Sequence, residues 1–520
     1  MCGIIGVISK ENRDDLGKLI ALGLYQQQNR GDHSAGIATI KKLPFSRVEY
    51  RRNRASAVGE GLSDFNPLAI RQGKGEVADI FSEEDFNNLT GFMGIGQVRY
   101  PTTGYVIDNS EQLSEKEKQK MILSSIQPLQ APHYKVAMVH NGDVNPDSYH
   151  EIIAQFEKEG LRKVTHNDLE AILKVFTRSF FDQTENVPNN QRVAKAVSDI
   201  FEKVKGTYSV GTIINNVGLL MFRDPNGRRP LFTGITQDKN GEITNYAFAS
   251  ETVALEKMLF KGTLQTNRPD IPFIHDEVKP GELVFISKDF KIYREQIASP
   301  DLKMCPFEAA YFMRPSSFFN GERVKQIRRN IINNMWQEFK SKPAYKNLME
   351  NKDNIVVVPV PRTAESAAVY LQHDAGLKYI NAIEKHPHSA RIFMQPTQEH
   401  RERETISDHF IYKEEIKGKD IILIDDSIVR GTTMKRIIKY MKDVGANSVH
   451  VFITFPHIIN PCMHAIDFHT KEELYSHGKY LYEMKKGLGL NNKDTLLYST
   501  PEIMKKSIGT NKLCNECYAK

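Results

Sequence analysis

The sequence lacks the features that mark a membrane-spanning, exported or nucleic-acid-binding protein. No apolar run approaches the ~18 residues that a transmembrane helix needs, and the start, MCGIIGVISK, has no basic segment of the kind that opens an export signal. The 70 basic residues barely exceed the 64 acidic ones, and a net charge of +6 suits small anionic substrates better than nucleic acid. Five cysteines, an odd number, indicate a reducing compartment, so we expect a cytoplasmic protein.

The most informative stretch of the chain runs from Ile421 to Thr433, IILIDDSIVRGTT. It opens with a β-branched apolar run, which is typical of a strand buried in a parallel sheet. Asp425 and Asp426 follow where this strand should end, and a loop with one glycine comes next. Apolar residues then recur at helical spacing, and a second apolar strand is expected at 449–455. The stretch therefore predicts a βαβ unit, in a chain of 520 residues that is long enough for two or more domains.

The loop after this strand has the residue types that bind a phosphorylated sugar. Backbone N–H groups at a helix N-terminus seat a phosphate, and a glycine lets the backbone come close. Two adjacent carboxylates can take ribose hydroxyls or a hydrated Mg²⁺. A strand followed by an ordinary acidic turn is the alternative. The whole string resembles the phosphoribosyl pyrophosphate (PRPP) signature of the type I phosphoribosyltransferases, which implies that PRPP, with Mg²⁺ on the two aspartates, is bound by Asp425, Asp426, Ser427, Gly431, Thr432 and Thr433.

Cys2 stands directly after the first methionine. Removal of Met1 would leave a cysteine with a free α-amine, which titrates near ~7.7–8.0 and can act as a general base at neutral pH. One residue would then supply both the nucleophile and the base. On position alone, a buried thiol in a first strand, CGIIGVI, is the commoner case.

Four later segments favour the nucleophile. They are RGDHSAGI (30–37), GQVRYPTTG (96–104), HNGDVN (140–145) and NDLE (167–170). In order and spacing they resemble the class II glutamine amidotransferases, which are N-terminal-nucleophile (Ntn) hydrolases. The resemblance covers roughly the first half of the chain, and it implies an α+β sandwich of four layers.

This resemblance implies roles for individual residues. Cys2 is the expected nucleophile, and the Asn141 side chain and the Gly142 N–H are expected to form an oxyanion hole. Arg99 is placed to grip the α-carboxylate of glutamine, because a guanidinium is a planar two-pronged donor. Asp168 is placed to hold the α-ammonium group. Further residues match the pattern around the glutamine pocket: Arg30, Tyr100 and Thr102.

The second half resembles the amidophosphoribosyltransferases, which join a class II amidotransferase to a phosphoribosyltransferase. CPFEAAYFMRPSS (305–317) matches their domain junction, and IVVVPVP (355–361) is expected to be a buried strand. The loop 362–366 stands where the family binds pyrophosphate, but it reads Arg-Thr-Ala-Glu-Ser where the family usually begins with Asp and then Ser or Thr. Segment 385–401 resembles the loop that closes over PRPP. The expected PRPP ligands from these two segments are Thr363, Lys385 and Arg391.

The remaining four cysteines suit a metal centre. Cys514 and Cys517 form a C-x₂-C pair, and with Cys305 and Cys462 they can supply four thiolates to an iron–sulfur cluster or to zinc. Sequence chemistry does not separate these two metals, and structural thiols beside a chance C-x₂-C are a third case. The contexts CPFE, PCMHAID and the terminal CxxC resemble the subclass of amidophosphoribosyltransferases that carries a [4Fe–4S] cluster, which implies this cofactor.

We therefore expect an N-terminal α+β Ntn-hydrolase sandwich (2–275), an α/β type I phosphoribosyltransferase domain with a parallel sheet (276–480) and a C-terminal tail (481–520). The resemblance implies transfer of glutamine-derived ammonia to C1 of PRPP, which gives 5-phosphoribosylamine, glutamate and pyrophosphate in the first committed step of purine synthesis. It also implies a homotetramer with purine nucleotides as feedback inhibitors. No nucleic-acid or membrane partner is expected.

Two other functions stay open at this point. The altered loop 362–366 would suit a PRPP- or nucleotide-sensing regulatory protein with weakened catalysis, although such a sensor has no need of the glutaminase residues. A different class II amidotransferase, such as a hexosamine or asparagine enzyme, would share the first half of the chain. Only the second half excludes it.

Overall fold

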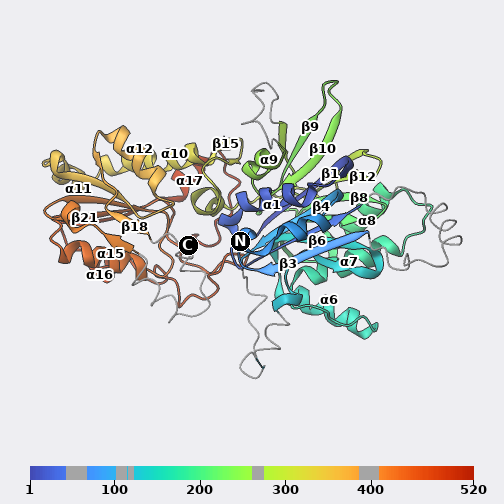
Figure 1. Ribbon diagram of the computed structural model, residues 1–520. Coiled ribbons are helices and arrows are strands. Elements are labelled where there is room, and N and C mark those ends of the chain that lie inside the picture. The colour runs from blue at the N-terminus through green and yellow to red at the C-terminus, as the bar shows by residue number, and fades with distance from the viewer. Residues whose placement is uncertain (42–66, 101–113, 115–121, 260–273, 386–408, 520) are drawn as a thin grey trace. The chain divides into compact units, whose positions relative to one another are not determined.

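The computed structural model describes residues 1–41, 67–100, 114, 122–259, 274–385 and 409–519 (Figure 1). The chain forms two compact units, Met1–Met304 and Cys305–Lys520. Two of the expected ligands, Thr102 and Arg391, lie outside the described residues. No helix in the described part of the chain is long and apolar enough to cross a membrane.

Two antiparallel sheets form the middle of the first unit. Within the described residues, the order of the seven-stranded sheet is β11 (Ile274–Glu277), β9 (Phe232–Gln237), β10 (Ile243–Ala249), β1 (Gly3–Arg13), β4 (Gly91–Arg99), β2 (Ser34–Ile40) and β3 (Leu68–Lys74). The order of the six-stranded sheet is β13 (Ile292–Gln296), β12 (Glu282–Ser287), β8 (Gly218–Arg223), β7 (Gly206–Ile214), β6 (Val136–Val144) and β5 (Leu129–Ala131).

Helices cover the outer faces of both sheets, which gives this unit four layers. The core between the sheets contains Ile4 and Ile95 from one sheet and Val139 and Leu219 from the other, all fully buried. The seven-stranded sheet is covered by α1 (Leu16–Gln26) and α9 (Thr252–Leu259), and the six-stranded sheet by α7 (Leu169–Phe181) and α8 (Asn189–Lys203). Shorter or peripheral helices are α3 (Val77–Ile80), α4 (Glu83–Asn88) and α6 (Pro146–Lys158). The expected α+β sandwich is confirmed.

The first unit extends further along the chain than we expected. Its end was placed at residue 275, but β11 pairs with β9, and β12 pairs with β8 in the second sheet. These strands complete the sandwich, so the division between the units falls after Met304.

The second unit is built on a parallel sheet. Within the described residues, the strand order is β17 (Lys378–Tyr379), β16 (Ile355–Pro359), β20 (Asp420–Asp425), β21 (Ser448–Ile453) and β22 (Thr495–Tyr498). The helices are α10 (Val324–Lys340), α11 (Pro343–Met349), α12 (Glu365–Ala375), α14 (Lys413–Ile416), α15 (Thr432–Asp443), α16 (Leu481–Gly487) and α17 (Pro501–Ile508), with a π-helical turn at Glu308–Phe312. Two small hairpins pair β14 (Phe318–Phe319) with β15 (Glu322–Arg323), and β18 (Ile383–Lys385) with β19 (His409–Ile411).

Helices cover both faces of this parallel sheet, which explains why its strands read as continuous apolar runs. In β21, Val451 and Ile453 share a core with Ile438 of α15. Phe452, between them, points to the opposite face, where its ring centroid lies 5.0 Å from that of Phe339 in α10. The segment 481–520 belongs to this unit and is not a separate tail, because β22 is a strand of the sheet and α17 packs on α10.

The βαβ unit expected from IILIDDSIVRGTT is present. Its first strand is β20 and its second is β21, and the two pair in parallel. The helix between them is α15, and the apolar residues that predicted it are all buried: Met434, Ile437, Ile438 and Met441.

Candidate active sites

The predicted nucleophile lies at the buried start of β1. Cys2 is 5% exposed, and its Sγ lies 3.8 Å from the carbonyl oxygen of Tyr100. Arg30 donates from Nε to the Cys2 carbonyl at 2.9 Å, and its Nη1 lies 3.1 Å from Oε1 of Glu251, with both charged side chains fully buried. Losing one partner of a buried pair leaves an uncompensated charge, typically at a cost of about 3–5 kcal/mol. Arg30 and Glu251 therefore fix the backbone that carries the thiol.

The predicted oxyanion hole lies in β6. Asn141 is fully buried, and neither atom of its side-chain amide has a hydrogen-bond partner among the described residues. An unsatisfied buried amide costs about 1–3 kcal/mol, which indicates a group that meets its partner only when a ligand is bound. At the next position, Gly142, a Cβ would lie 2.0 Å from the Thr207 carbonyl oxygen of the neighbouring strand β7, so only glycine fits there.

The predicted anchors for the amino-acid group of glutamine are buried and hydrogen-bonded. Arg99, at the end of β4, is 3% exposed and donates to the Ser125 carbonyl oxygen. Asp168 stands at the start of α7 without making a capping bond. Its Oδ2 accepts from the Val144 N–H at 2.8 Å and lies 3.2 Å from Nε2 of His140. Burial raises the pKa of Asp168, but the hydrogen bonds from His140 and the Val144 N–H, together with the Arg99 charge, bring that pKa below its usual value, so the carboxylate is ionised.

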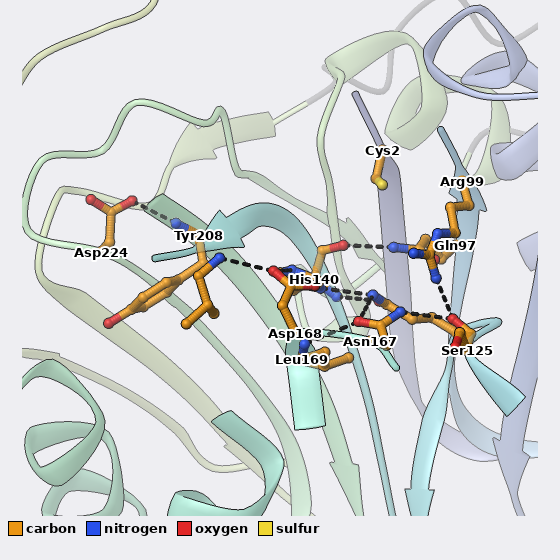
Figure 2. Close-up of polar contacts among 12 residues, drawn as sticks. Cys2, Gln97, Arg99, Ser125, His140, Asn167, Asp168, Leu169, Tyr208 and Asp224 are labelled. Atoms are coloured by element: carbon orange, nitrogen blue, oxygen red, sulfur yellow. Dashed lines mark hydrogen bonds and ion pairs between the residues drawn. The ribbon is translucent and has the colours of Figure 1, made fainter. Parts of the chain in front are cut away.

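Cys2, Arg99 and Asp168, labelled in Figure 2, come from segments that pack on one another. Gly3, next to Cys2, pairs with Val98, next to Arg99, so the nucleophile and the guanidinium lie on adjacent strands. Strand β4 contacts β6 of the facing sheet, and β6 contacts α7, where Asp168 lies. The first unit thus brings together one thiol, one unpartnered amide, one guanidinium and one carboxylate, which is the chemistry that an amide-hydrolysing site for an α-amino acid needs.

Three polar residues of this site were missed from the sequence. Gln127, His140 and Asn167 are buried and hydrogen-bonded to one another, and they connect the surroundings of Arg99 to Asp168. His140 and Asn167 stand inside motifs that we recognised, but no pattern indicated that their side chains meet.

The predicted PRPP loops follow the two central strands of the parallel sheet. From β16 the chain crosses to β17 on one side and then to β20 on the other, so the strand order reverses between β16 and β20. Open α/β sheets bind ligands at the carboxyl ends of strands at such a switch point. Pro359 is level with Ile424 at the end of both strands. The loops 361–366 and 425–431 therefore leave the same edge of the sheet, side by side.

The acidic pair stands where β20 ends. The Asp426 N–H donates to Oδ1 of Asp425 at 2.9 Å, and the Ser427 hydroxyl donates to Oδ2 of Asp426 at 2.8 Å. Burial, and then the neighbouring charge of Asp426, raise the pKa of Asp425 well above its usual value. Two such carboxylates favour a bound cation, which would reduce their mutual repulsion.

The predicted phosphate seat begins at Gly431, which precedes α15 with a φ of +79° and has the Tyr475 ring against its Cα. Thr432 and Thr433 open the helix, so backbone N–H groups and hydroxyls converge there. In the loop after β16, Thr363 is half-buried, whereas Arg362 and Glu365 are exposed. The Pro361–Arg362 peptide bond is cis. Lys385 is the last residue of β18 and is half-buried.

The four other cysteines lie in the second unit. Cys305 and Cys462 are buried, while Cys514 and Cys517 are half-buried. Burial and the charges of the other three thiolates raise the pKa of Cys517 well above its usual value, so these sulfur atoms influence one another. The Ile459 N–H donates to the Cys517 carbonyl at 2.9 Å, which holds the C-terminal segment beside the Cys462 region. In the described part of the chain, no group of three or more His, Cys, Asp or Glu side chains is arranged to hold a metal ion.

Comparison with known proteins covers both halves of the chain. A family model described as a glutamine amidotransferase domain matches residues 116–257, and one described as a phosphoribosyl transferase domain matches residues 325–461. An amidophosphoribosyltransferase of Pseudomonas aeruginosa is 30% identical over 517 residues, which cover 99% of this chain and 90% of the relative. The protein of the same name from Pyrococcus horikoshii is 32% identical over 519 residues, which cover 99% and 95% of the two chains.

Two solved structures resemble the whole chain. One, described as the allosteric regulatory enzyme of purine biosynthesis, matches with a TM-score of 0.75 at 25% identity and covers 100% of this chain and 95% of its own. The other is glutamine PRPP amidotransferase from B. subtilis complexed with ADP and GMP, with a TM-score of 0.75 at 26% identity and coverage of 100% and 96%. Nothing in these relatives favours the sensing alternative. The chain therefore belongs to the amidophosphoribosyltransferases, the enzymes that transfer glutamine-derived ammonia to PRPP in purine synthesis.

Proposed function

We propose that the first unit hydrolyses glutamine with Cys2 as nucleophile. Once Met1 is removed, the α-amine of Cys2 takes the Sγ proton as the sulfur attacks the amide carbon. The Asn141 side chain and the Gly142 N–H stabilise the oxyanion. The amine returns the proton to the leaving nitrogen, so ammonia departs and a thioester remains. Water then attacks the thioester carbon, the C–S bond breaks, and glutamate and the thiol are released.

Recognition of glutamine divides between two buried charges. Arg99 pairs with the α-carboxylate, and Asp168, held ionised by its surroundings, pairs with the α-ammonium group. Arg30 and Tyr100 belong to the same recognition set, as does Thr102 by its match to the family pattern, and Arg30 acts there through its bond to the Cys2 carbonyl. Glutamine lacking either charged group should therefore be a poor substrate.

The second unit carries the transfer step. The residues that hold PRPP are Asp425, Asp426, Ser427, Gly431, Thr432, Thr433, Thr363, Lys385 and Arg391. The aspartates orient the ribose, the start of α15 seats the 5-phosphate, and ammonia forms the C1–N bond as the C1–O bond to pyrophosphate breaks. Asp425 and Asp426 would hold Mg²⁺, which would supply charge neutralisation for the leaving group. The observation that carries this proposal is the position of both PRPP loops at the switch point of the sheet.

The cysteine set fits a four-thiolate cofactor by its chemistry. Burial and the charges of the other three thiolates raise the pKa of Cys517, so a cationic centre beside it would favour the thiolate, and a [4Fe–4S] cluster takes four thiolates. Cys305, Cys462, Cys514 and Cys517 would hold it and would link the C-terminal segment to the rest of the second unit. Such a cluster would act on stability and requires the reducing, cytoplasmic setting expected from the sequence.

Regulation and assembly follow the family. We expect purine nucleotides to inhibit the enzyme, since the B. subtilis structure is described as a complex with ADP and GMP. We also expect a homotetramer, and a native mass that corresponds to a monomer alone would contradict this expectation.

The assignment of two separate reaction centres is tested by Cys2→Ala. Glutamine-dependent formation of phosphoribosylamine should be lost, while formation from free ammonia should be retained, because ammonia needs only the second centre. The measurement is pyrophosphate release with each nitrogen source. Ser9→Ala, a change in the same strand whose hydroxyl bonds Asn245, serves as the control. Equal loss of both activities in Cys2→Ala would contradict the two-centre assignment.

A further inference from the structure

A continuous chain of buried hydrogen bonds runs between the two proposed anchors of glutamine. It begins at Arg99, which donates to the Ser125 carbonyl. That carbonyl also accepts from Nδ2 of Asn167 at 2.7 Å. Asn167 Oδ1 accepts from Nε2 of Gln127 at 3.2 Å, and the same Nε2 lies 2.7 Å from Nδ1 of His140. His140 ends the chain at Asp168, as the dashed lines in Figure 2 show.

Backbone groups fix the direction of every bond in this chain. Asn167 cannot turn its amide over, because Oδ1 accepts from the Leu169 N–H at 3.0 Å while Nδ2 donates to a carbonyl. Gln127 is fixed in the same way, since its Oε1 accepts from the His140 N–H at 2.7 Å. Nε2 of Gln127 is therefore a donor toward His140. A ring nitrogen that faces a donor must carry a lone pair, so Nδ1 of His140 is unprotonated and Nε2 bears the proton.

We propose that Gln127 and Asn167 hold His140 as a neutral imidazole that donates from Nε2 to Asp168, and that all three are positioning residues for the amino-acid group of glutamine. This inference rests on the proposed roles of Arg99 and Asp168. An imidazolium would place two donors face to face at Nδ1, and turning the Gln127 amide to avoid this would set its oxygen against Asn167 Oδ1.

The neutral form matters for the charge that the substrate meets. His140 and the Val144 N–H both reach Oδ2 of Asp168, which leaves Oδ1 for the α-ammonium group of glutamine. Because the imidazole carries no charge, Asp168 keeps its full negative charge for that pairing. The same chain reaches Arg99 at the Ser125 carbonyl, which accepts from both Arg99 and Asn167.

The decisive variant is Gln127→Glu, which keeps the shape of the side chain and reverses its role at Nδ1. A carboxylate there draws a proton onto His140, and the resulting imidazolium offsets the charge of Asp168. We expect KM for glutamine to rise on the order of tenfold to a hundredfold, as for the loss of one hydrogen bond to a charged group, with kcat near that of the wild type. Gln237→Glu, at the exposed end of β9 in the same unit, controls for the added charge.

A glutamine analogue without the α-amine, 4-carbamoylbutanoate, separates positioning from a structural role. In Gln127→Glu, the preference for glutamine over this analogue, as a ratio of kcat/KM, should fall by about the same factor as KM rises. An equal loss on both compounds, or an unchanged KM, would overturn the inference.

Neutron diffraction on the wild-type protein provides an independent measurement. We expect deuterium on Nε2 of His140 and none on Nδ1, and deuterium on Nδ1 would overturn the inference whatever the kinetics show. A wild-type protein that leaves glutamine intact with PRPP and Mg²⁺ present would instead refute the proposed function, and the neutron map would still decide the state of His140.

Discussion

At the residue scale, the clearest functional signal is a side chain with no partner. Asn141 is fully buried with both amide atoms unsatisfied among the described residues, while nearby Gln127 and Asn167 are hydrogen-bonded. A fold that hydrogen-bonds Gln127 and Asn167 but leaves both amide atoms of Asn141 open stores an unfavourable free energy there. A hydrogen bond from Asn141 to the oxyanion of a tetrahedral intermediate would recover that free energy. The recovery would then lower the barrier of the reaction.

The first prediction concerns this amide. Asn141→Ala should lower kcat for glutamine hydrolysis by about 10²–10³-fold, which is the usual effect of removing one oxyanion donor. KM should change little, because Arg99 and Asp168, and not Asn141, are proposed to bind glutamine before it reacts. The free energy of unfolding should fall by much less than the loss in kcat corresponds to, since the wild-type Asn141 amide has no hydrogen-bond partner to lose. A loss in KM with kcat intact would place Asn141 in substrate binding and not in catalysis. The measurement is steady-state glutamate release, alongside urea unfolding.

At the element scale, α15 and the strand before it connect sequence to site most directly. Apolar residues at helical spacing predicted the helix, and the run before them predicted β20, because both patterns are local and strong. The turn between them needs a backbone of positive φ at Gly431. The conformation that lets α15 begin there is the same one that exposes its first N–H groups to a phosphate.

The second prediction tests this turn. Gly431→Ala places a Cβ at a φ of +79° and 2.5 Å from the Tyr475 ring. Left-handed backbone costs a residue with a Cβ about 1–2 kcal/mol, and the contact with the ring adds to it, so both the urea midpoint and PRPP binding should fall.

Gly445, after the end of the same helix, provides the matched control. Gly445 has a φ of +95°, but a Cβ added there would lie 3.7 Å from its nearest neighbour, a side-chain carbon of Lys417. Gly445→Ala should lower stability through backbone strain alone and leave KM for PRPP near the wild-type value. Equal effects of the two substitutions on KM would mean that the Gly431 turn is not the phosphate seat.

Other elements could not be foreseen from local patterns. The pairing of β11 with β9 and of β12 with β8 joins segments far apart in the chain, so nothing near residue 275 indicated that the first unit continues. Cys2, Asn141 and Gly142 could be predicted as site residues because short motifs carry them. Gln127 could not, since its partners His140 and Asn167 stand 13 and 40 residues away and no periodicity relates them.

At the scale of the whole molecule, the third prediction concerns the metal centre. Protein purified under argon from iron-replete cells should be brown, with about four irons per chain. Cys514→Ser should lose the iron, whereas Cys2→Ala should keep it, because Cys2 lies in the other unit. Zinc in place of iron would correct the cofactor, and metal-free, colourless protein from such a preparation would contradict a metal centre altogether. Metal analysis of the three proteins decides among these outcomes.

The central claim is that one chain contains two reaction centres that work together, and glutamate release from glutamine measures it most directly. The rate should be followed with and without PRPP and Mg²⁺, with pyrophosphate measured in parallel. We predict that release rises strongly when PRPP and Mg²⁺ are present, accompanied by pyrophosphate. Glutamate release that is indifferent to PRPP, with no pyrophosphate formed, would contradict the account and leave a glutaminase beside an inactive second unit.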